Sequence, residues 1–279
     1  MQRTALMQVA AAAAAVTLAA TLGASARPQA TTIQVRTTMD AAQEVPAPSG
    51  DVAGARGTFS ATVTRSGTGA SVSWQMSFSG LTGNAVAAHI HQAAAGSSGP
   101  VVLPLCAPCQ SSASGTGNLP EAALDALEAG NTYVNIHTPT NPAGEIRGQL
   151  AITAAVSTTL DARQERPRPR GNVRRARGTF TATFAKLGTS GTMTWRLRFS
   201  GLTGRAVAAH LHAAPRGRPG PVLVPLCGPC RNGARGTATL QPAALAALES
   251  GRAYVNVHTP RNQAGEIRGQ IRPVPLSID

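Results

Sequence analysis

The chain has 279 residues, of which 42% are hydrophobic but only 3% aromatic and 13% charged, and its formal net charge is +13. Glycine and proline are frequent, at 29 and 20 residues. Small side chains combined with many turn residues argue against a helical protein and indicate a β-rich, loop-rich, secreted one.

The N-terminus has the pattern of a secretory signal peptide, which we assign to residues 1–26. Arg3 supplies a positive start, residues 5–23 form an uncharged apolar run, and residues 24–26, ending at Ala26, provide small residues for signal peptidase. A retained membrane anchor is the alternative. No later stretch is apolar over the roughly 20 residues that span a bilayer. We expect a mature chain without a transmembrane segment, secreted into the periplasm or extracellular space or held at the cell surface.

The rest of the chain contains two copies of one domain. A shift of 121 residues aligns residues 37–150 with residues 158–271 without a gap. A copy of this length suits a small independent domain. Only residues 151–157 separate the copies, so we expect the last strand of the first copy to run almost directly into the first strand of the second.

Alternation of apolar and polar residues predicts strands in each copy. In residues 72–78, Val72, Trp74, Met76 and Phe78 alternate with polar residues. Further strands of the first copy are predicted at residues 58–63, 100–105, 132–138 and 145–152. A starting proline, good helix formers and a closing glycine predict a short helix over residues 120–130. The predicted fold is all-β: two tandem antiparallel β-sandwiches, each with one short helix.

The six histidines occupy the same three positions in both copies: His89, His91 and His137, and His210, His212 and His258. Residues two apart on a strand point the same way, so each His-x-His pair shares one face. If the strand of His137 is a neighbour, three imidazoles converge, and imidazole nitrogen suits copper or zinc. Alternatively, the histidines only form hydrogen bonds along a sandwich edge.

A third strand carries a carboxylate and a guanidinium on one face, Glu145 and Arg147 in the first copy and Glu266 and Arg268 in the second. If this strand adjoins the histidines, the carboxylate could orient one imidazole ring by accepting a hydrogen bond from the ring nitrogen that does not bind the metal. The alternative is a solvated strand face.

Two C-x-x-C pairs, Cys106 with Cys109 and Cys227 with Cys230, predict disulfides in an exported protein. Zinc ligation together with the histidines is one alternative, and redox catalysis is another. Redox catalysis needs the first cysteine at a helix N-terminus, whereas residues 231–240 predict a loop and then a strand.

Charge divides the copies. Residues 37–150 carry three basic and seven acidic side chains, and residues 158–271 carry 18 basic and four acidic ones. Seven arginines lie within 15 residues: Arg163, Arg166, Arg168, Arg170, Arg174, Arg175 and Arg177. The prolines among them predict an extended, solvated loop.

This arginine loop predicts contact with a polyanion, such as an acidic surface polysaccharide, lipid headgroups or extracellular nucleic acid. It has no interleaved aromatic residues for base stacking, so specific recognition of nucleic acid is not expected. A solubilising surface, or a docking surface for the acidic first copy, is the alternative.

The segments "AVAAHIHQAAAGSSGPVVLPL" and "YVNIHTPTNPAGEIRGQL", with "AVAAHLHAAPRGRPGPVLVPL" and "YVNVHTPRNQAGEIRGQI" in the second copy, closely resemble the CHRD (chordin) domain family. This module is common in exported bacterial proteins, and the resemblance covers residues 37–150 and 158–271. Residues 41–46 are similar to the family's opening strand. The resemblance implies an immunoglobulin-like or superoxide-dismutase-like β-sandwich without agreed catalytic residues.

The His-x-His strand also looks like its counterpart in copper/zinc superoxide dismutases. A dinuclear dismutase site needs more histidine and aspartate ligands than one copy provides, so a dismutase is not expected. We expect an exported tandem CHRD protein that acts as a binding module and not as an enzyme, with its second domain on polyanions. The alternative is a copper- or zinc-binding protein with one three-histidine site per domain, which handles metal or carries out a redox reaction.

Overall fold

A computed structural model describes residues 32–278 of the chain. The predicted signal peptide and its cleavage position lie outside these residues. Within the described part, no helix is long and apolar enough to cross a membrane.

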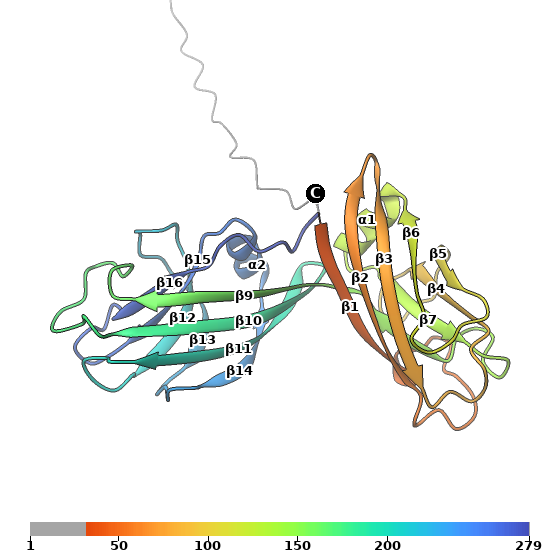
Figure 1. Cartoon of the computed structure of the whole chain (residues 1–279), viewed down its shortest axis with the longest axis horizontal. Coiled ribbons are helices and arrows are strands. Elements are labelled where there is room, and N and C mark those ends of the chain that lie inside the picture. Colours follow the sequence, from red (N-terminus) through yellow and green to blue (C-terminus); the bar gives the residue numbers. More distant parts are fainter. Residues whose placement is uncertain (1–31, 279) are drawn as a thin grey trace, which may run out of the picture.

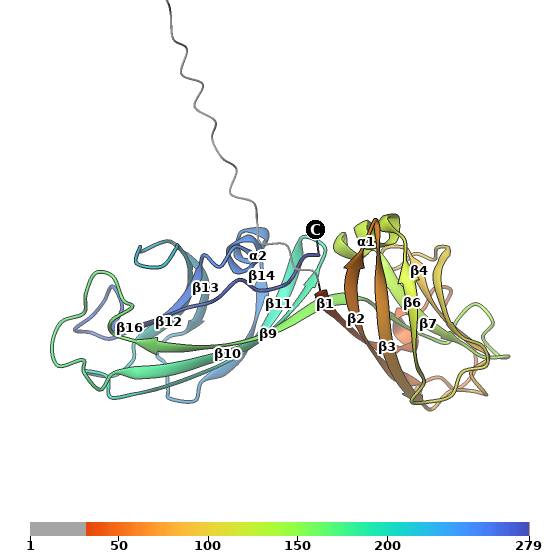
Figure 2. The same ribbon diagram turned by 45° about the horizontal axis from the view of Figure 1, so that its top comes forward.

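The two copies fold into two sandwiches that lie end to end along the long axis of the molecule (Figures 1 and 2). The first contains β1 (Thr32–Asp40), η1 (Ala41–Gln43), β2 (Arg56–Ser66), β3 (Gly69–Ser79), β4 (Ala87–Gln92), β5 (Val101–Cys106), β6 (Ser114–Leu119), α1 (Glu121–Glu128), β7 (Thr132–His137) and β8 (Ile146–Gln149). The second contains β9 (Ala151–Asp161), β10 (Arg177–Leu187), β11 (Ser190–Ser200), β12 (Ala208–Ala213), β13 (Val222–Cys227), β14 (Arg235–Leu240), α2 (Pro242–Glu249), β15 (Ala253–His258) and β16 (Ile267–Gln270).

The predicted all-β class and antiparallel pairing are confirmed. In the first domain one layer has the order β6-β3-β2-β1, and the other has the order β5-β4-β7-β8, with β1 also pairing with β8. The second domain repeats this arrangement with β14-β11-β10-β9 and β13-β12-β15-β16. Along β3, Val72, Trp74 and Met76 are buried between the layers while the intervening polar residues are exposed. The alternation therefore buries one face of each layer.

Each copy also contains the predicted helix. Leu124 and Leu127 of α1 are buried, and Gly130 follows the helix with a φ of +74°. Glycine adopts this left-handed conformation without a steric penalty, so it suits the end of a helix.

One expectation about the start of the domain was wrong. Residues 41–46 do not form the opening strand, because β1 ends at Asp40. The Asp40 carboxylate accepts a hydrogen bond from the Gln43 backbone N–H and caps the 3-10 turn η1 there. The chain thereby leaves the sheet and carries Glu44 over its outer face.

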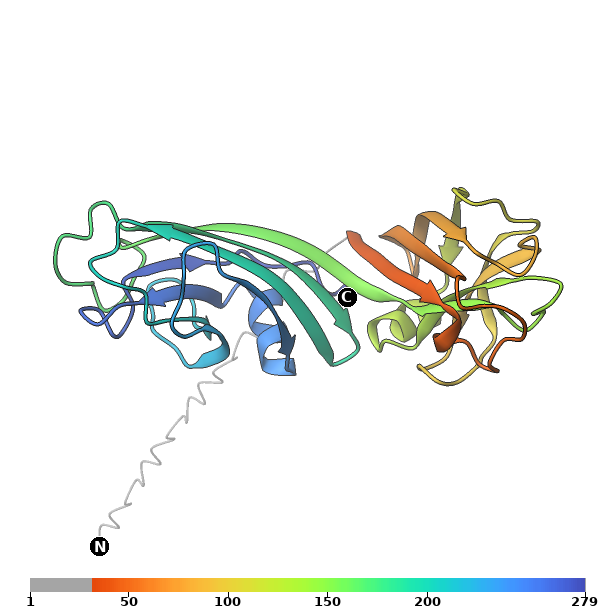
Figure 3. The same cartoon turned by 90° about the horizontal axis from the view of Figure 1, so that it is seen from below.

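Strand β9 belongs to both domains. Its first residues, 151–153, pair with residues 34–36 of β1, and residues 152–161 pair with β10. Figure 3 shows this strand running without a break from one sandwich into the other. The expectation that the last strand of the first copy runs into the first strand of the second is confirmed, and all strands of the described part form one 16-stranded sheet.

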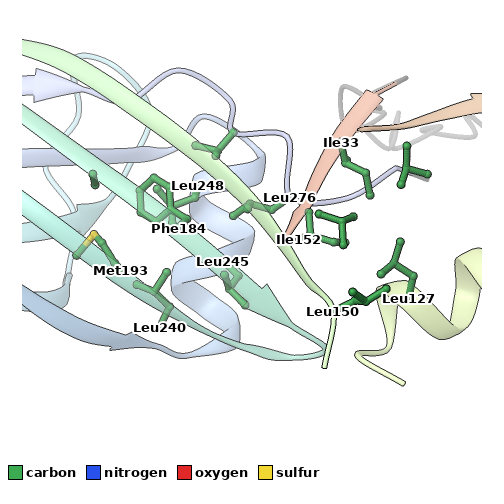
Figure 4. Close-up of a cluster of buried hydrophobic side chains, with 14 of the residues drawn as sticks. Ile33, Leu127, Leu150, Ile152, Phe184, Met193, Leu240, Leu245, Leu248 and Leu276 are labelled. Atoms are coloured by element: carbon green, nitrogen blue, oxygen red, sulfur yellow. The ribbon is translucent and has the colours of Figure 1, made fainter. Parts of the chain in front are cut away.

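The junction between the domains has its own apolar core (Figure 4). Leu127, Leu150 and Ile152 lie on one side of it, and Leu248 and Leu276 approach from the second domain; all five are buried. Because burial of one such side chain contributes about 1.5–3 kcal/mol, this core joins the two domains firmly.

A polar clamp beside this core links three segments. The Lys186 ammonium lies 2.9 Å from the Glu249 carboxylate and 3.3 Å from that of Glu128, and it donates to the Leu276 carbonyl. The Ile278 N–H donates to Glu128 at 2.7 Å. The clamp therefore fastens the C-terminal residues to α1 of the first domain.

Candidate metal centre

Strand register brings the histidines of each copy together. Strand β4 pairs with β7 so that Ala87 faces His137, His89 faces Asn135 and His91 faces Tyr133. Residues between them on both strands, such as Ile90, point into the sandwich core. The imidazoles therefore lie on the outer face of this layer, as the two-residue period predicts.

The three rings of each copy are close enough to hold one ion. Their ligand nitrogens lie within 4.8 Å of one another, and the second copy forms the same group. His89 Nδ1 is 3.1 Å from His137 Nε2, and His210 Nδ1 is 3.0 Å from His258 Nε2. Two of the three rings in each group are buried, while His89 and His210 are partly exposed. An ion can enter from the side of the exposed ring.

Backbone carbonyls fix the tautomer of the two buried rings. His91 Nδ1 lies 2.9 Å from the Gly99 carbonyl, and His137 Nδ1 lies 3.0 Å from the Pro142 carbonyl. A carbonyl only accepts hydrogen bonds, so each Nδ1 carries the proton and donates it. Each Nε2 then presents a lone pair. Metal-bound histidines are oriented in this way by a partner of the other ring nitrogen.

The same geometry recurs in the second copy, where His212 donates to Gly220 at 2.9 Å and His258 to Gln263 at 2.8 Å. Among the described residues, the buried Nε2 atoms of His91 and His212 have no hydrogen-bond partner. An unpaired buried nitrogen is costly, and a metal ion would supply the missing partner.

Burial keeps these imidazoles neutral. It lowers the pKa of His89, and the neighbouring imidazoles lower it further. The same two causes lower the pKa of His210 to about 4. Burial likewise lowers the pKa of His137, with the hydrogen bond to Pro142 acting in the opposite direction. Neutral imidazole is the form that binds metal, so the rings do not need to lose protons at neutral pH.

A stack of three side chains supports His91. Its ring lies parallel to that of Tyr133, with centroids 4.9 Å apart, and the Arg147 guanidinium lies over the Tyr133 ring, 3.4 Å from its centroid. Arg147 also donates to the carbonyls of Ser97 and Ala94. It thereby holds the loop that contains Gly99, the acceptor that orients His91.

Arg147 and Glu145 are both buried, and the same is true of Arg268 and Glu266, so the alternative of a solvated strand face does not hold. Glu145 does not reach the imidazoles. Its carboxylate accepts hydrogen bonds from Thr82, Thr138 and Asn141. It precedes the first residue of β8, where strand alternation no longer fixes the direction of the side chain.

These hydrogen bonds also set the ionisation of Glu145. Burial alone would raise the pKa of the carboxyl, but the donors from Thr138, Thr82 and Asn141 together lower it. Glu145 therefore stays ionised and fastens the loops around residues 82 and 141. Glu266 is held in the same way by Thr203, Thr259 and Asn262, and its pKa is lowered for the same reasons. Backbone carbonyls, and not the expected carboxylate, accept the hydrogen bonds that orient the imidazole rings.

A different carboxyl group lies beside the site, and the sequence reasoning missed it. Glu44 is buried, and burial raises its pKa. The Asn135 side chain adjoins both the Glu44 carboxyl and the His91 ring. Among the described residues, Glu44 Oε2 and Asn135 Oδ1 have no hydrogen-bond partner, and Glu165 and Asn256 repeat this in the second copy. A glutamate shared by "AAQEVP" and "ARQERP" was the signal available in the sequence.

Both cysteine pairs form disulfides, Cys106 with Cys109 and Cys227 with Cys230, which confirms the structural prediction for them. The sulfurs are bonded to each other and do not contribute ligands to either histidine group.

The arginine loop lies between β9 and β10 and surrounds a pocket of about 660 Å³. Six of its seven arginines are exposed, and Arg166 is half-buried, donating to the carbonyls of Arg163 and Glu165. Within residues 32–278, none of the seven forms an ion pair. The loop is thus an open cationic surface.

Comparison with known proteins agrees with this duplicated architecture. No curated protein matches the chain. The family model described as the CHRD domain matches twice, over residues 35–150 and 156–271. Each match includes one complete histidine group with the strands that carry it, so the chain belongs to the CHRD domain family and consists of two such domains in tandem.

Proposed function

We propose that the protein binds copper or zinc, with one ion on His89, His91 and His137 and a second ion on His210, His212 and His258. The observation that supports this most directly is the tautomer of the buried rings. Each of them directs its Nδ1–H to a backbone carbonyl, so that Nε2 carries the lone pair. In His91 and His212 this buried Nε2 has no hydrogen-bond partner among the described residues. If the histidines only formed hydrogen bonds along a sandwich edge, the buried Nε2 atoms of His91 and His212 would also be expected to have partners.

The donor set suits these two metals. Three neutral imidazoles with an open fourth position form a typical site for zinc, and imidazole nitrogen also suits copper. When bound, either metal would supply a Lewis-acidic centre at the surface of the domain, and copper would in addition supply redox chemistry. The chain's own residues hold and orient the imidazoles and keep them unprotonated. We assign no reaction to this site.

The metal content of the mature protein, without a histidine tag, tests this proposal. The protein is incubated with copper or zinc and desalted, and the metal per chain is measured by mass spectrometry. We expect two ions per chain for the unchanged protein, one for His91→Ala and one for His212→Ala. The double variant should bind none. Circular dichroism of each variant checks that the fold persists.

The one-site variants are matched controls for each other, because the unchanged domain reports on metal loading within the same molecule. A stoichiometry near zero for the unchanged protein would overturn the proposal, and so would full retention of metal by the double variant. For copper, nitrogen hyperfine coupling in the electron paramagnetic resonance spectrum adds an independent readout of imidazole ligation.

A second candidate function rests on the arginine loop. We propose that the exported protein contacts polyanions at the cell surface or in the extracellular space through Arg163, Arg168 and their neighbours. Exposed arginines without ion pairs in the described structure support this proposal. The test is retention on a heparin or polyuronate matrix. Retention should weaken with salt and be lost when the loop arginines are replaced by glutamine; unchanged retention would refute this role.

A further inference from the structure

We propose that the outer face of β10, β11 and β14 in the second domain binds an acidic polysaccharide. Four side chains define this arginine face: Arg177, Arg196, Arg198 and Arg235. The inference rests on the second candidate function, polyanion contact, and deepens it. It names the class of ligand and adds a sheet surface next to the arginine loop, which ends at Arg177.

Strand register forces these like charges together. Arg196 of β11 lies directly opposite Arg235 of β14. Arg198 follows two residues along β11, on the same face, and faces Thr179 of β10. All four arginines are exposed. Like charges directly opposite each other on a sheet are unfavourable, so an anion on this face would relieve repulsion that folding creates.

Within residues 32–278, no carboxylate forms an ion pair with the arginine face. The second copy contains four carboxylates, Asp161, Glu165, Glu249 and Glu266. Three are engaged or buried elsewhere: Glu249 pairs with Lys186, Glu266 is held by neighbouring hydroxyl and amide groups, and Glu165 is buried.

The fourth carboxylate, Asp161, lies opposite Arg177 across the β9–β10 pair. It accepts hydrogen bonds from the backbone of Arg163 and from Gln164. No ion pair involves any member of the arginine face within the part of the chain that the structure describes. An anion from outside the chain can therefore bind these guanidinium groups without first displacing an ion pair.

Hydroxyl groups lie between the arginines. Thr179, Thr181, Thr194 and Thr237 are exposed on the same face. Guanidinium groups match carboxylates with two parallel hydrogen bonds, and threonine hydroxyls can both donate to and accept from sugar hydroxyls. This mixture fits a chain of sugars with acidic groups.

Two other polyanions fit less well. Base stacking on single-stranded nucleic acid needs exposed aromatic rings, but Trp195 of β11 is buried on the inner side. Membrane docking needs an apolar surface. The large apolar side chains exposed in residues 32–278 are Val86, Val101, Leu187 and Val222, and none of them belongs to the arginine face.

The first domain provides a matched control, because its equivalent sheet has uncharged side chains at three of the four positions; Arg56 is the counterpart of Arg177. Gln75, Ser77 and Ser114 occupy the positions of Arg196, Arg198 and Arg235, in an identical register. The variant Arg196→Gln/Arg198→Ser/Arg235→Ser therefore installs side chains that this fold already accommodates. The reverse variant, Gln75→Arg/Ser77→Arg/Ser114→Arg, transfers the charges to the first domain.

The experiment measures binding of the full mature chain to polygalacturonate by calorimetry and by retention on the immobilised polymer. We expect the face variant to bind about tenfold more weakly, because each exposed charge contact changes affinity by roughly two- to threefold. A second control variant, Arg216→Gln/Arg252→Gln/Arg272→Gln, removes the same charge from exposed positions elsewhere and should bind like the unchanged protein. The reverse variant should bind more tightly.

Equal weakening by the face variant and the second control variant would overturn the proposal, because it would indicate a response to net charge alone. Unchanged binding by the face variant, together with loss of binding in the loop variant, would also overturn it, while leaving the arginine loop as the polyanion site. Absence of binding by the unchanged protein would refute both the arginine face and the arginine loop as polyanion sites. Tighter binding to single-stranded DNA or to phosphatidylglycerol vesicles than to polygalacturonate would overturn the choice of ligand.

Discussion

The two domains have a cation at equivalent positions, buried in the second domain and exposed in the first. Lys186 is bound between Glu128 and Glu249, and all three side chains are about 12–13% exposed. Its counterpart Arg65 pairs with Glu121 at 3.1 Å, with side chains 33% and 51% exposed. We predict that Lys186→Ala destabilises the protein strongly and that Arg65→Ala hardly does so.

The expected magnitudes follow from burial. Removing the cation of a buried ion pair leaves uncompensated charge and costs about 3–5 kcal/mol, and Lys186→Ala leaves two carboxylates in that state. An exposed pair contributes roughly 0–1 kcal/mol. A triple variant, Lys186→Met/Glu128→Gln/Glu249→Gln, removes all three charges at similar volume. It should recover most of the loss, since the penalty comes from unpaired charge.

Urea denaturation followed by tryptophan fluorescence measures both effects, because each domain has one tryptophan, Trp74 or Trp195. In a Trp74→Phe background, Trp195 reports on the second domain, and the converse variant reports on the first. With a slope of about 1–3 kcal/mol per molar urea, Lys186→Ala should lower the midpoint by more than 1 M. Free energies of unfolding for Lys186→Ala and Arg65→Ala within about 1 kcal/mol of each other would refute this reasoning.

Two further predictions concern the metal centre. With metal removed by a chelator, stability should fall as pH falls from 6.5 to about 4. Burial and the neighbouring imidazoles lower the pKa of His210 from its usual 6.5 to about 4 in the folded protein, so the unfolded chain binds more protons in this range. Constant urea midpoints from pH 7 to pH 4 would contradict this. Arg147→Lys should weaken metal binding in the first domain about 10–100-fold. The carbonyls of Ala94 and Ser97 then lose the two guanidinium hydrogen bonds that hold this loop, and the loop contains the carbonyl that orients His91. Competition with a chromogenic chelator measures this affinity, with His212→Ala as the background, and an unchanged affinity would show that the loop holds its place without Arg147.

Much of the fold could be predicted because its signals are local. The alternation in β3 and the proline and glycine around α1 act over a few residues. Because the domain is duplicated, the same patterns occur in both copies of the sequence. The junction was predictable only in outline. Residues 152–161 of β9 pair with the next strand along the chain, β10. The pairing of residues 151–153 with β1, by contrast, joins residues more than 100 positions apart in the sequence.

The metal centre, too, could be predicted only in part. Period-two alternation placed His89 and His91 on one face, and the adjacency of β4 and β7 completed the group. The partners that orient the rings could not be predicted, because they are backbone carbonyls, which every residue has. Glu44 was missed because a 3-10 turn, and not a strand, carries it across the sheet.

Comparison of the two copies separates what the metal centre requires from what it tolerates. His137 donates to the backbone carbonyl of Pro142 and His258 to that of Gln263, so residues of different type supply the same backbone acceptor at the same place. The stack of imidazole, tyrosine and guanidinium is also the same, with the Arg268 guanidinium 3.4 Å from the Tyr254 ring. The outer sheet faces, by contrast, carry glutamine and serine in one copy and arginine in the other. A duplicated protein of this kind can keep two equal metal centres while one domain alone acquires a charged surface, because the two features lie on opposite layers of each sandwich and share no side chain.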